Sequence, residues 1–316
     1  MMSPQMLISI LLLPIAVTAA SFSLSDRPTL KYGTAWKKEA TADLVYRAVL
    51  NGFRHIDTAC QPRHYNEAGV GEGWTKAAET LGLNRGDIWL QTKFSSLDAQ
   101  DPDNTPYDRN APLEDRVRTS LQVSLQNLKT DYLDSWVMHG PENNWEDNFK
   151  VWGAMEEGVD QGKVKQLGIS NWYRLEDIQW LYDHARIKPK VVQNRFYSDS
   201  GHDVEIRRFC KENDIEYQSF WTLGANREAY KHQAAVELAD KYNLSPEGLF
   251  YAFCMKIGIT PLDGTTDEQH MKEDIDLLNR LRNGEVFFES DDELSIIGDA
   301  LGTPDWRADV DLEEEL

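Results

Sequence analysis

The chain has 316 residues, 41% of them hydrophobic, which is enough for a large core in either one α/β barrel or two domains. It carries 33 Lys and Arg against 53 Asp and Glu, a formal net charge of −20. Such an acidic surface argues against binding of nucleic acid or of anionic lipid, although a local basic pocket for a phosphorylated cofactor remains compatible with it. The three cysteines, Cys60, Cys210 and Cys254, have no zinc-binding spacing, so we expect no metal site.

The N-terminus differs from the rest of the chain. Residues 6–20 form an apolar run that ends in small residues, and we interpret residues 1–20 as a signal peptide. The run is short for a membrane span, is interrupted by Pro14, and has no Lys or Arg before Arg27. We therefore expect residues 21–316 to form the folded domain, with no stable membrane span after removal of the leader. Entry into the secretory pathway or an organelle is the corresponding location, with a cytoplasmic location as the alternative.

From residue 29 onwards, short β-rich runs alternate with amphipathic runs of helical period. The expected strands are residues 29–33, 53–57, 88–93, 132–139, 164–170, 191–194, 216–220 and 259–262. The expected helices are residues 42–51, 68–81, a stretch after Pro112, 145–161, 175–185, 204–213, 232–242, 247–257 and 267–281. This alternation predicts parallel strands joined by right-handed crossovers, and eight such units fit a closed (β/α)8 TIM barrel.

A doubly wound open sheet is the competing fold. It would normally place a G-x-G-x-x-G turn after the first strand, and the nearest match is residues 69–74. That match ends in Trp74 and follows a loop rather than a strand, so the barrel is the better interpretation.

Local signals place several helix ends. Thr41 is expected to cap the first helix. Ser245, followed by Pro246, is expected to cap the helix at residues 247–257. Thr266 is expected to form a capping box with Gln269 at the start of the last helix. The acidic tail from Asn283 has no clear periodicity, so we expect it to cover one mouth of the barrel or to be partly disordered.

Ionisable residues stand at the ends of consecutive expected strands. Asp57, Lys93 and His139 close the second, third and fourth strands, and Tyr65 lies on the loop after Asp57. A parallel barrel gathers its strand ends on one face, where its active site lies. A phenol has a pKa of about 10. The ammonium of Lys93, held in place by Asp57, is expected to lower the pKa of Tyr65. Tyr65 and His139 could then bind and protonate a carbonyl oxygen, while a nicotinamide cofactor supplies the hydride that no side chain can.

Several ordered segments carry a resemblance to a known family. They read GFRHIDTA, YNEAGVG, LQTKF, SLQNLKTDYLDSWVMHGP, GKVKQLGISNW and VVQNRFY. Together they resemble the aldo-keto reductases over residues 30–278. The resemblance implies a (β/α)8 barrel, reduction of an aldehyde or ketone, and a catalytic set of Asp57, Tyr65, Lys93 and His139. It also implies nicotinamide contacts from Ser170, Asn171 and Gln193, stacking on Phe220, and a pyrophosphate cover from Leu223 and Gly224.

The chain departs from the family pattern at three places. The gap from Asp57 to Tyr65 is longer, with residues 61–63 as the extra ones, so His64 could reach the pocket. An insertion over residues 95–111 is expected to form a rim loop at the substrate entrance. The family's Lys-Ser…Arg clamp for the adenosine 2′-phosphate is altered, with Thr265 and Thr266 left to bind phosphate and His270 in the place of the Arg. NADPH is the cofactor that the resemblance implies, with NADH as a possibility.

Other interpretations remain open. The chain could be a catalytically weak, cofactor-binding regulatory or partner subunit on the same barrel. Ser170 and Asn171 could simply cap the following helix. Cys60 could be a redox-sensitive thiol or an unreactive residue at the pocket edge. The resemblance favours a monomer that acts on a small carbonyl substrate, and the sequence does not specify which substrate.

Overall fold

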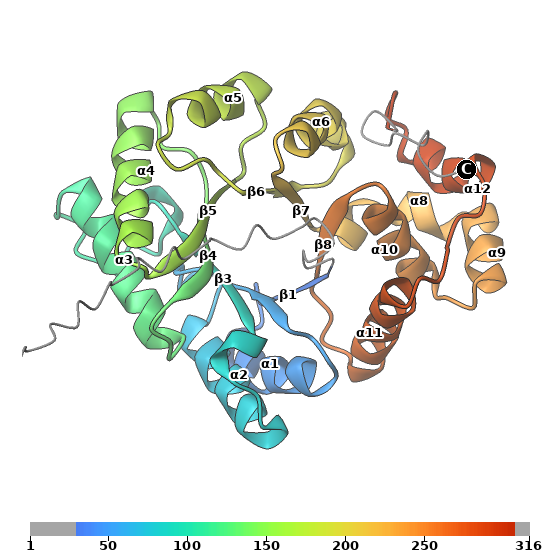
Figure 1. Cartoon of the computed structure of the whole chain (residues 1–316), viewed down its shortest axis with the longest axis horizontal. Coiled ribbons are helices and arrows are strands. Elements are labelled where there is room, and N and C mark those ends of the chain that lie inside the picture. Colours follow the sequence, from blue (N-terminus) through green and yellow to red (C-terminus); the bar gives the residue numbers. More distant parts are fainter. Residues whose placement is uncertain (1–29, 307–316) are drawn as a thin grey trace, which may run out of the picture.

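The computed structural model describes residues 30–306 and shows a closed barrel of parallel strands surrounded by helices (Figure 1). The strands follow one another around the barrel in chain order, and β1 closes it by pairing with β8. The (β/α)8 fold is thereby confirmed. The strands are β1 (Lys31–Gly33), β2 (His55–Asp57), β3 (Trp89–Phe94), β4 (Leu133–Met138), β5 (Val164–Ser170), β6 (Val191–Arg195), β7 (Glu216–Phe220) and β8 (Ile259–Asp263).

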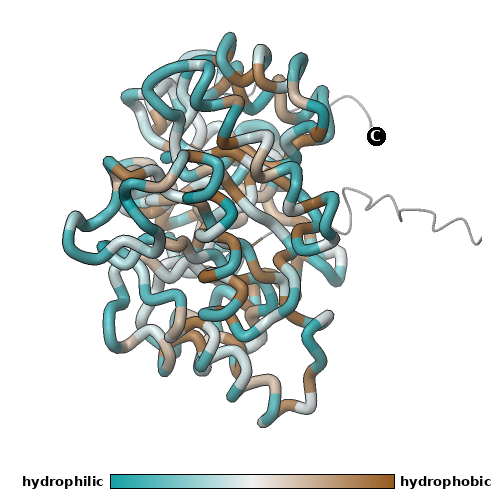
Figure 2. The backbone as a smooth tube through the Cα atoms, turned by 90° about the vertical axis from the view of Figure 1, so that its left-hand side faces the viewer, coloured by the Kyte–Doolittle hydropathy of each residue, from teal (hydrophilic) through white to brown (hydrophobic). Residues whose placement is uncertain are grey.

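The helices lie outside the strands, and along their tubes hydrophobic and hydrophilic stretches alternate, as helices with one buried face require (Figure 2). They are α1 (Thr41–Leu50), α2 (Glu67–Leu81), α3 (Leu113–Asn127), α4 (Trp145–Asp160), α5 (Leu175–His184), α6 (Val204–Glu212), α7 (Thr222–Ala225), α8 (Arg227–Lys231), α9 (Gln233–Lys241), α10 (Pro246–Lys256), α11 (Glu268–Arg282) and α12 (Asp291–Gly298).

The helix caps confirm one of the three expected start signals. The Ser245 hydroxyl accepts the amide of Gly248 at the start of α10, as expected. The expected capping box at Thr266 is wrong, because the Asp267 side chain caps α11. Thr41 is the first residue of α1 rather than its cap, and its hydroxyl donates to the Lys38 carbonyl.

The glycines of residues 69–73 serve helix packing. A Cβ on Gly71 would lie 2.0 Å from the carbonyl oxygen of Asn127, and one on Gly73 would lie 2.5 Å from that of Ala42. Only glycine lets α2 approach the end of α3 and the start of α1 this closely. The pattern that resembles a dinucleotide fingerprint therefore has a packing explanation.

The tail after Asn283 contains a helix, contrary to expectation. Ser290 caps α12, whose Leu294 and Ile297 are buried, and α12 packs against α8, α9 and α10 in the outer helical layer. The described part of the tail thus covers helices rather than a barrel mouth. The expected signal peptide lies outside the described residues. Within residues 30–306 no helix is long and apolar enough to cross a membrane.

Candidate active site

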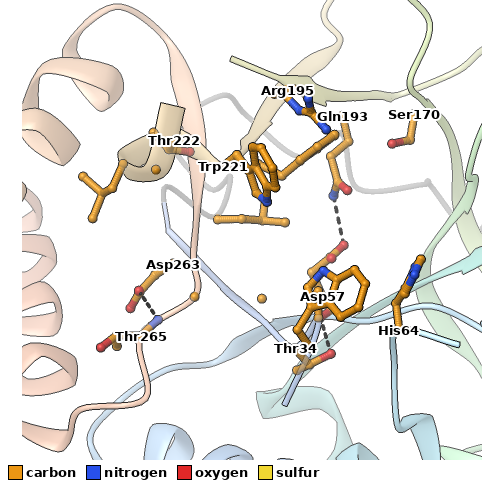
Figure 3. A pocket seen from close by; sticks show the side chains of 18 of the residues that line it. Thr34, Asp57, His64, Ser170, Gln193, Arg195, Trp221, Thr222, Asp263 and Thr265 are labelled. Atoms are coloured by element: carbon orange, nitrogen blue, oxygen red, sulfur yellow. Dashed lines mark hydrogen bonds between the residues drawn. The ribbon is translucent and has the colours of Figure 1, made fainter. Parts of the chain in front are cut away.

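A cavity of about 1010 Å³ opens at the carboxyl ends of the strands. Its walls come mainly from residues at or just after the ends of the strands, and residues of α10 and α11 complete them. The cavity therefore lies where a barrel fold normally carries chemistry. Figure 3 shows Asp57, Ser170 and Gln193 on one side of it and Asp263 and Thr265 on another. Residues at the carboxyl ends of the strands thus line one shared cavity, as the parallel barrel predicts.

A buried ion pair forms the floor of the site. The Lys93 ammonium lies 2.6 Å from the Asp57 carboxylate and 2.8 Å from the Thr58 carbonyl oxygen. The second Asp57 oxygen accepts hydrogen bonds from the side-chain amides of Gln91 and Gln193, at 2.7 and 2.9 Å. Burial lowers the pKa of Lys93, and the Asp57 carboxylate opposes that shift. Asp57 thus holds Lys93 in a fixed position, as expected.

Tyr65 lies above this pair and lines the cavity. The Lys93 ammonium is 5.4 Å from the centre of the Tyr65 ring, and within the described chain the Tyr65 hydroxyl makes no hydrogen bond to it. Burial, followed by the negative charge of Asp57, raises the pKa of Tyr65. The expected lowering by Lys93 is therefore wrong for this structure, because burial dominates the shift and the Asp57 charge adds to it. The phenol keeps its proton at neutral pH, as a proton donor must.

His139 follows β4 and faces Tyr65 across the cavity, with the two ring centres 5.9 Å apart and the rings edge to face. Burial lowers the pKa of His139 well below its usual range, and the charges of Lys93 and His64 lower it further. The imidazole is therefore neutral at physiological pH. Its Nδ1 lies 2.6 Å from the Ser95 hydroxyl oxygen.

Sequence reasoning missed the role of Ser95. The inserted segment 95–111 holds this residue, since the Tyr107 hydroxyl donates to the Ser95 carbonyl at 2.7 Å and the Gln100 amide donates to it at 3.3 Å. A serine hydroxyl that donates to Nδ1 leaves the ring proton on Nε2, the nitrogen that remains for a ligand. The inserted segment thus holds a residue that contacts His139 inside the cavity. The signal for this role was the position of Ser95 directly after a strand.

The altered loop around Tyr65 is also anchored to the insertion. The Gln61 side chain donates to the Ala99 carbonyl at 2.8 Å and lies 3.0 Å from Nδ1 of His64. His64 lines the cavity, as expected from the longer loop. Cys60 is buried, and burial raises the pKa of its thiol, which makes it an unreactive residue.

The residues expected to contact the nicotinamide line the cavity, namely Ser170, Asn171, Gln193 and Phe220. Leu223 and Gly224, which were expected to cover the pyrophosphate, line it too. Some of the polar atoms of the first four already make hydrogen bonds within the protein. The Asn171 amide donates to the His139 carbonyl at 2.7 Å, from a backbone position with φ of 61°. The Gln193 amide nitrogen donates to Asp57 and to Gln218, so its oxygen is the atom left to accept from a ligand. These positions fit a carboxamide-bearing ring lying on Phe220.

The expected phosphate clamp is only partly present. Thr265 and His270 line the cavity, whereas Thr266 is not among its lining residues. The Thr265 hydroxyl accepts the backbone amide of Asp267, so it serves the turn before α11. Sequence reasoning missed Asp263, which lines the cavity directly at the end of β8. It also missed Arg195 at the end of β6. Both residues stand one position after the end of a predicted strand, so a search extended by one residue would have found them.

No group of His, Cys, Asp and Glu able to hold a metal ion occurs in residues 30–306.

Comparison with known proteins shows the family of the chain. The family model described as "Aldo/keto reductase family" matches residues 27–289. The chain belongs to the aldo/keto reductase family.

Individual relatives are distant but cover most of the chain. The NADPH-dependent alpha-keto amide reductase of Saccharomyces cerevisiae is 27% identical over 263 residues, 76% of this chain and 78% of the relative. Glyoxal reductase of Bacillus subtilis is 27% identical over 242 residues, again 76% and 78%. The solved structure of the aldo-keto reductase MGS-M4, from a Medee basin deep-sea metagenome library, superposes with a TM-score of 0.70 at 20% identity. It covers 87% of this chain and 91% of its own.

In this aldo/keto reductase the directions of the two pKa shifts predict a flat pH profile. Tyr65 stays protonated because its pKa is raised above 10.0, and His139 stays neutral because its pKa lies well below 6.5. The rate of carbonyl reduction at saturating substrate is expected to be constant between about pH 6.5 and 9. Steady-state rates measured across this range test it. A fall with a midpoint between about pH 7 and 8 would show a lysine-lowered phenol instead.

Removal of the Ser95 hydroxyl is expected to disturb the His139 tautomer. In Ser95→Ala, Nδ1 loses its partner, and the turnover number should fall about tenfold, the worth of one hydrogen bond. ¹⁵N shifts of the imidazole report which nitrogen carries the proton, a readout that simple loss of packing would not move. Ser95→Thr keeps a hydroxyl and should restore both values. Unchanged ¹⁵N shifts in Ser95→Ala would rule out this role.

Proposed function

We propose that this chain reduces the carbonyl group of a small aldehyde or ketone to the alcohol, with a nicotinamide dinucleotide as the hydride donor. The observation that carries the proposal is the meeting of a protonated phenol, a neutral imidazole and a buried Asp57–Lys93 pair beside one large cavity. The names of the yeast and Bacillus relatives both describe reductases of carbonyl compounds, which supports the same reaction type.

In the proposed reaction, a dihydronicotinamide held in the cavity would supply the hydride that the carbonyl carbon accepts. The His139 N–H donates a hydrogen bond to the carbonyl oxygen and orients it. The Tyr65 hydroxyl gives its proton to the oxygen as the C–O bond becomes that of an alkoxide, so that hydride and proton together make the alcohol. Lys93, held by Asp57, stabilises the phenolate that remains until it regains a proton from solvent.

The nicotinamide end of the cavity fits such a cofactor. Ser170, Asn171 and the Gln193 oxygen would hold the carboxamide, and Phe220 would lie against the ring. NADPH is the cofactor typical of the family and is named for the yeast relative. Leu223 and Gly224, in α7 on the cavity wall, would cover the pyrophosphate.

A second function is favoured by one observation. The Tyr65 hydroxyl makes no hydrogen bond to Lys93 anywhere in the described structure, and the loop that carries it is longer than the family pattern. A barrel that binds the cofactor yet turns over slowly would act as a sensor or partner subunit. Catalytic hydrogen bonds commonly tighten only when substrate is bound, so the reductase remains our proposal.

One pair of measurements separates the two functions. Titration of the purified protein with NADPH and NADH, followed by tryptophan fluorescence, measures binding. The loss of reduced-nicotinamide absorbance with a panel of small aldehydes and ketones measures turnover. Binding with turnover supports the reductase, binding without turnover supports the partner subunit, and the absence of binding contradicts both.

A further inference from the structure

The interior of the barrel is polar at positions where barrels of this kind are usually filled by Val, Ile and Leu. Lys31, Gln91, Glu216 and Gln218 lie within it, and all four side chains are buried. None of them is among the described residues that line the cavity. Burial of polar and charged groups is unfavourable unless they are hydrogen-bonded, so the arrangement of their hydrogen bonds decides what this cluster can do.

Two amides pair across the interior, one from β3 and one from β7. These strands stand opposite each other in the closed barrel, and Nε2 of Gln91 donates to Oε1 of Gln218 at 2.6 Å. Nε2 of Gln218 donates in turn to Oε1 of Gln91 at 3.1 Å. The pair alone permits two arrangements, which differ by a flip of both amides.

A carboxylate at each side of the pair selects one arrangement, because an ionised carboxylate only accepts hydrogen bonds. Glu216 Oε2 accepts from Nε2 of Gln218 at 2.7 Å. Asp57 Oδ1 accepts from Nε2 of Gln91, also at 2.7 Å. A flip of the amide pair would turn an oxygen towards each carboxylate. The Lys31 ammonium, 3.6 Å from the other Glu216 oxygen, supplies a counter-charge at the amino ends of the strands.

Gln193 is the third amide of this network. Its Nε2 donates to Gln218 Oε1 and to Asp57 Oδ1, both at 2.9 Å, and the bond to Asp57 is drawn in Figure 3. With both hydrogens used, the oxygen of this amide is the atom that remains for a ligand. Gln91 and Gln193 together hold one oxygen of Asp57, and the other oxygen accepts from Lys93 at 2.6 Å.

We propose that Gln218 is a positioning residue for the reaction, oriented by Glu216 from the end of the barrel opposite the cavity. Its oxygen accepts from Gln91 and Gln193 together, which fixes both amides on Asp57 and turns the Gln193 oxygen towards the cavity. Through these contacts it sets the geometry of the buried ion pair and of the acceptor for the carboxamide of a nicotinamide. The inference rests on the proposed function, which places that carboxamide at Gln193.

The first test uses the unaltered protein and a cofactor analogue. In the 3-acetylpyridine form of the reduced dinucleotide, a methyl group replaces the carboxamide NH2 that would donate to Gln193. The ordinary dinucleotide is expected to bind about tenfold more tightly, the effect of leaving one buried acceptor unpaired. Quenching of tryptophan fluorescence measures both dissociation constants. Equal affinity for the two forms overturns the inference, even where carbonyl reduction is retained.

The second test removes the shared acceptor. Gln218→Met replaces the amide by an apolar group of similar length, so the preference for the ordinary dinucleotide should fall to about twofold or less. Turnover should fall about tenfold, because Asp57 and Lys93 lose their fixed geometry. A purely structural role would leave the preference intact, so an unchanged preference in this variant contradicts the positioning role.

Ser135→Ala is the matched control for this variant. Ser135 lies beside Gln91 in the sheet, and its buried hydroxyl has no hydrogen-bond partner in the described chain. Its removal deletes a buried polar atom next to the network without breaking the network. Both the preference and the turnover should equal those of the unaltered protein. A loss of preference as large as that in Gln218→Met would assign the effect to general loosening of the barrel and contradict the inference.

An exchanged protein keeps the acceptor while changing the residue. In Glu216→Gln combined with Gln218→Glu, the carboxylate at position 218 accepts from Gln91 and Gln193, and the amide at position 216 donates to it. The number of charges is unchanged. This protein should retain most of the preference and most of the turnover that Gln218→Met loses. A loss as complete as that in Gln218→Met contradicts the proposed role of the shared acceptor.

A hydrogen-exchange measurement needs no variant to fold. With ¹⁵N in the glutamine side chains, the NH2 groups of Gln91, Gln193 and Gln218 should exchange in D2O at least about a hundredfold more slowly than that of the exposed Gln233, because every hydrogen of the three is bonded. Exchange of the Gln193 amide as fast as that of Gln233 overturns the inference.

The outcomes distinguish this inference from the proposed function. Carbonyl reduction with no preference between the two dinucleotide forms removes the positioning role of Gln218 and leaves the reductase standing. A failure of every dinucleotide to bind removes the reductase and, with it, the inference.

Discussion

Replacement of Tyr65 by Phe is expected to lower the turnover of carbonyl reduction by about 10²–10⁴-fold, the usual contribution of a positioned general acid. The change removes a single oxygen from a side chain that lines the cavity and makes no hydrogen bond to Lys93, so the fold should survive it. Cofactor affinity should change little, because the hydroxyl acts on the substrate oxygen. Steady-state rates and fluorescence titrations on the same preparation measure the two effects separately.

A matched control is available on α1. Tyr46→Phe deletes the same atom from a partly buried tyrosine that packs against the core and does not line the cavity. Its turnover should equal that of the unaltered protein. Near-normal turnover in Tyr65→Phe would remove Tyr65 from the role of proton donor and direct attention to His64 or a bound water.

Replacement of Lys93 by Met is expected to lower the free energy of unfolding by about 3–5 kcal/mol, the usual cost of leaving one partner of a buried ion pair unpaired. Lys93 is 0% exposed and Asp57 is 2% exposed, so the carboxylate that remains cannot recover its solvation from water. Urea-induced unfolding followed by circular dichroism measures the change. Turnover should also fall sharply, because the phenolate left on Tyr65 loses its stabilising charge.

Two further variants make this prediction specific. Asp57→Asn combined with Lys93→Met removes both charges and should restore part of the lost stability, because no unpaired ion remains buried. Lys150→Met breaks an exposed pair with Glu146 on α4 and should change stability little. A Lys93→Met protein as stable as the unaltered one would show that the pair contributes nothing to folding.

The barrel could be predicted from sequence because its signals are local and repeated. β5 and β7 have the predicted bounds, and the other strands differ by one or two residues at one end or at both. Since parallel strands all end on one face, locating the strand ends also located Asp57, His139 and Gln193 on the cavity wall. This part of the site follows from chain geometry alone.

The features that sequence missed depend on competition between neighbours in space. Tyr65 was expected to have a lowered pKa because a lysine was near, yet Asp57 takes that lysine and burial decides the direction. Asp267 outcompetes Thr266 for the α11 cap, although both residue types cap helices.

Two other misses have the same origin. α12 forms in an acidic tail because Leu294 and Ile297 find buried contacts in the outer helical layer, which no periodicity within the tail reveals. The Asp263 side chain is hydrogen-bonded to that of Asp274, which is eleven positions further along the chain. In each case the partner that decides the outcome is distant in sequence or concealed by the loop geometry.

The most direct test of the central claim follows the hydride itself. A reduced dinucleotide deuterated at its hydride-donating carbon is mixed with the protein and an aldehyde, and the alcohol is examined by mass spectrometry and NMR. We predict that one deuterium appears on the carbinol carbon in each turnover, and that Tyr65→Phe forms this product far more slowly while binding the dinucleotide as before. Alcohol that forms without deuterium on that carbon, or label that is lost to solvent, would contradict direct hydride transfer in this cavity.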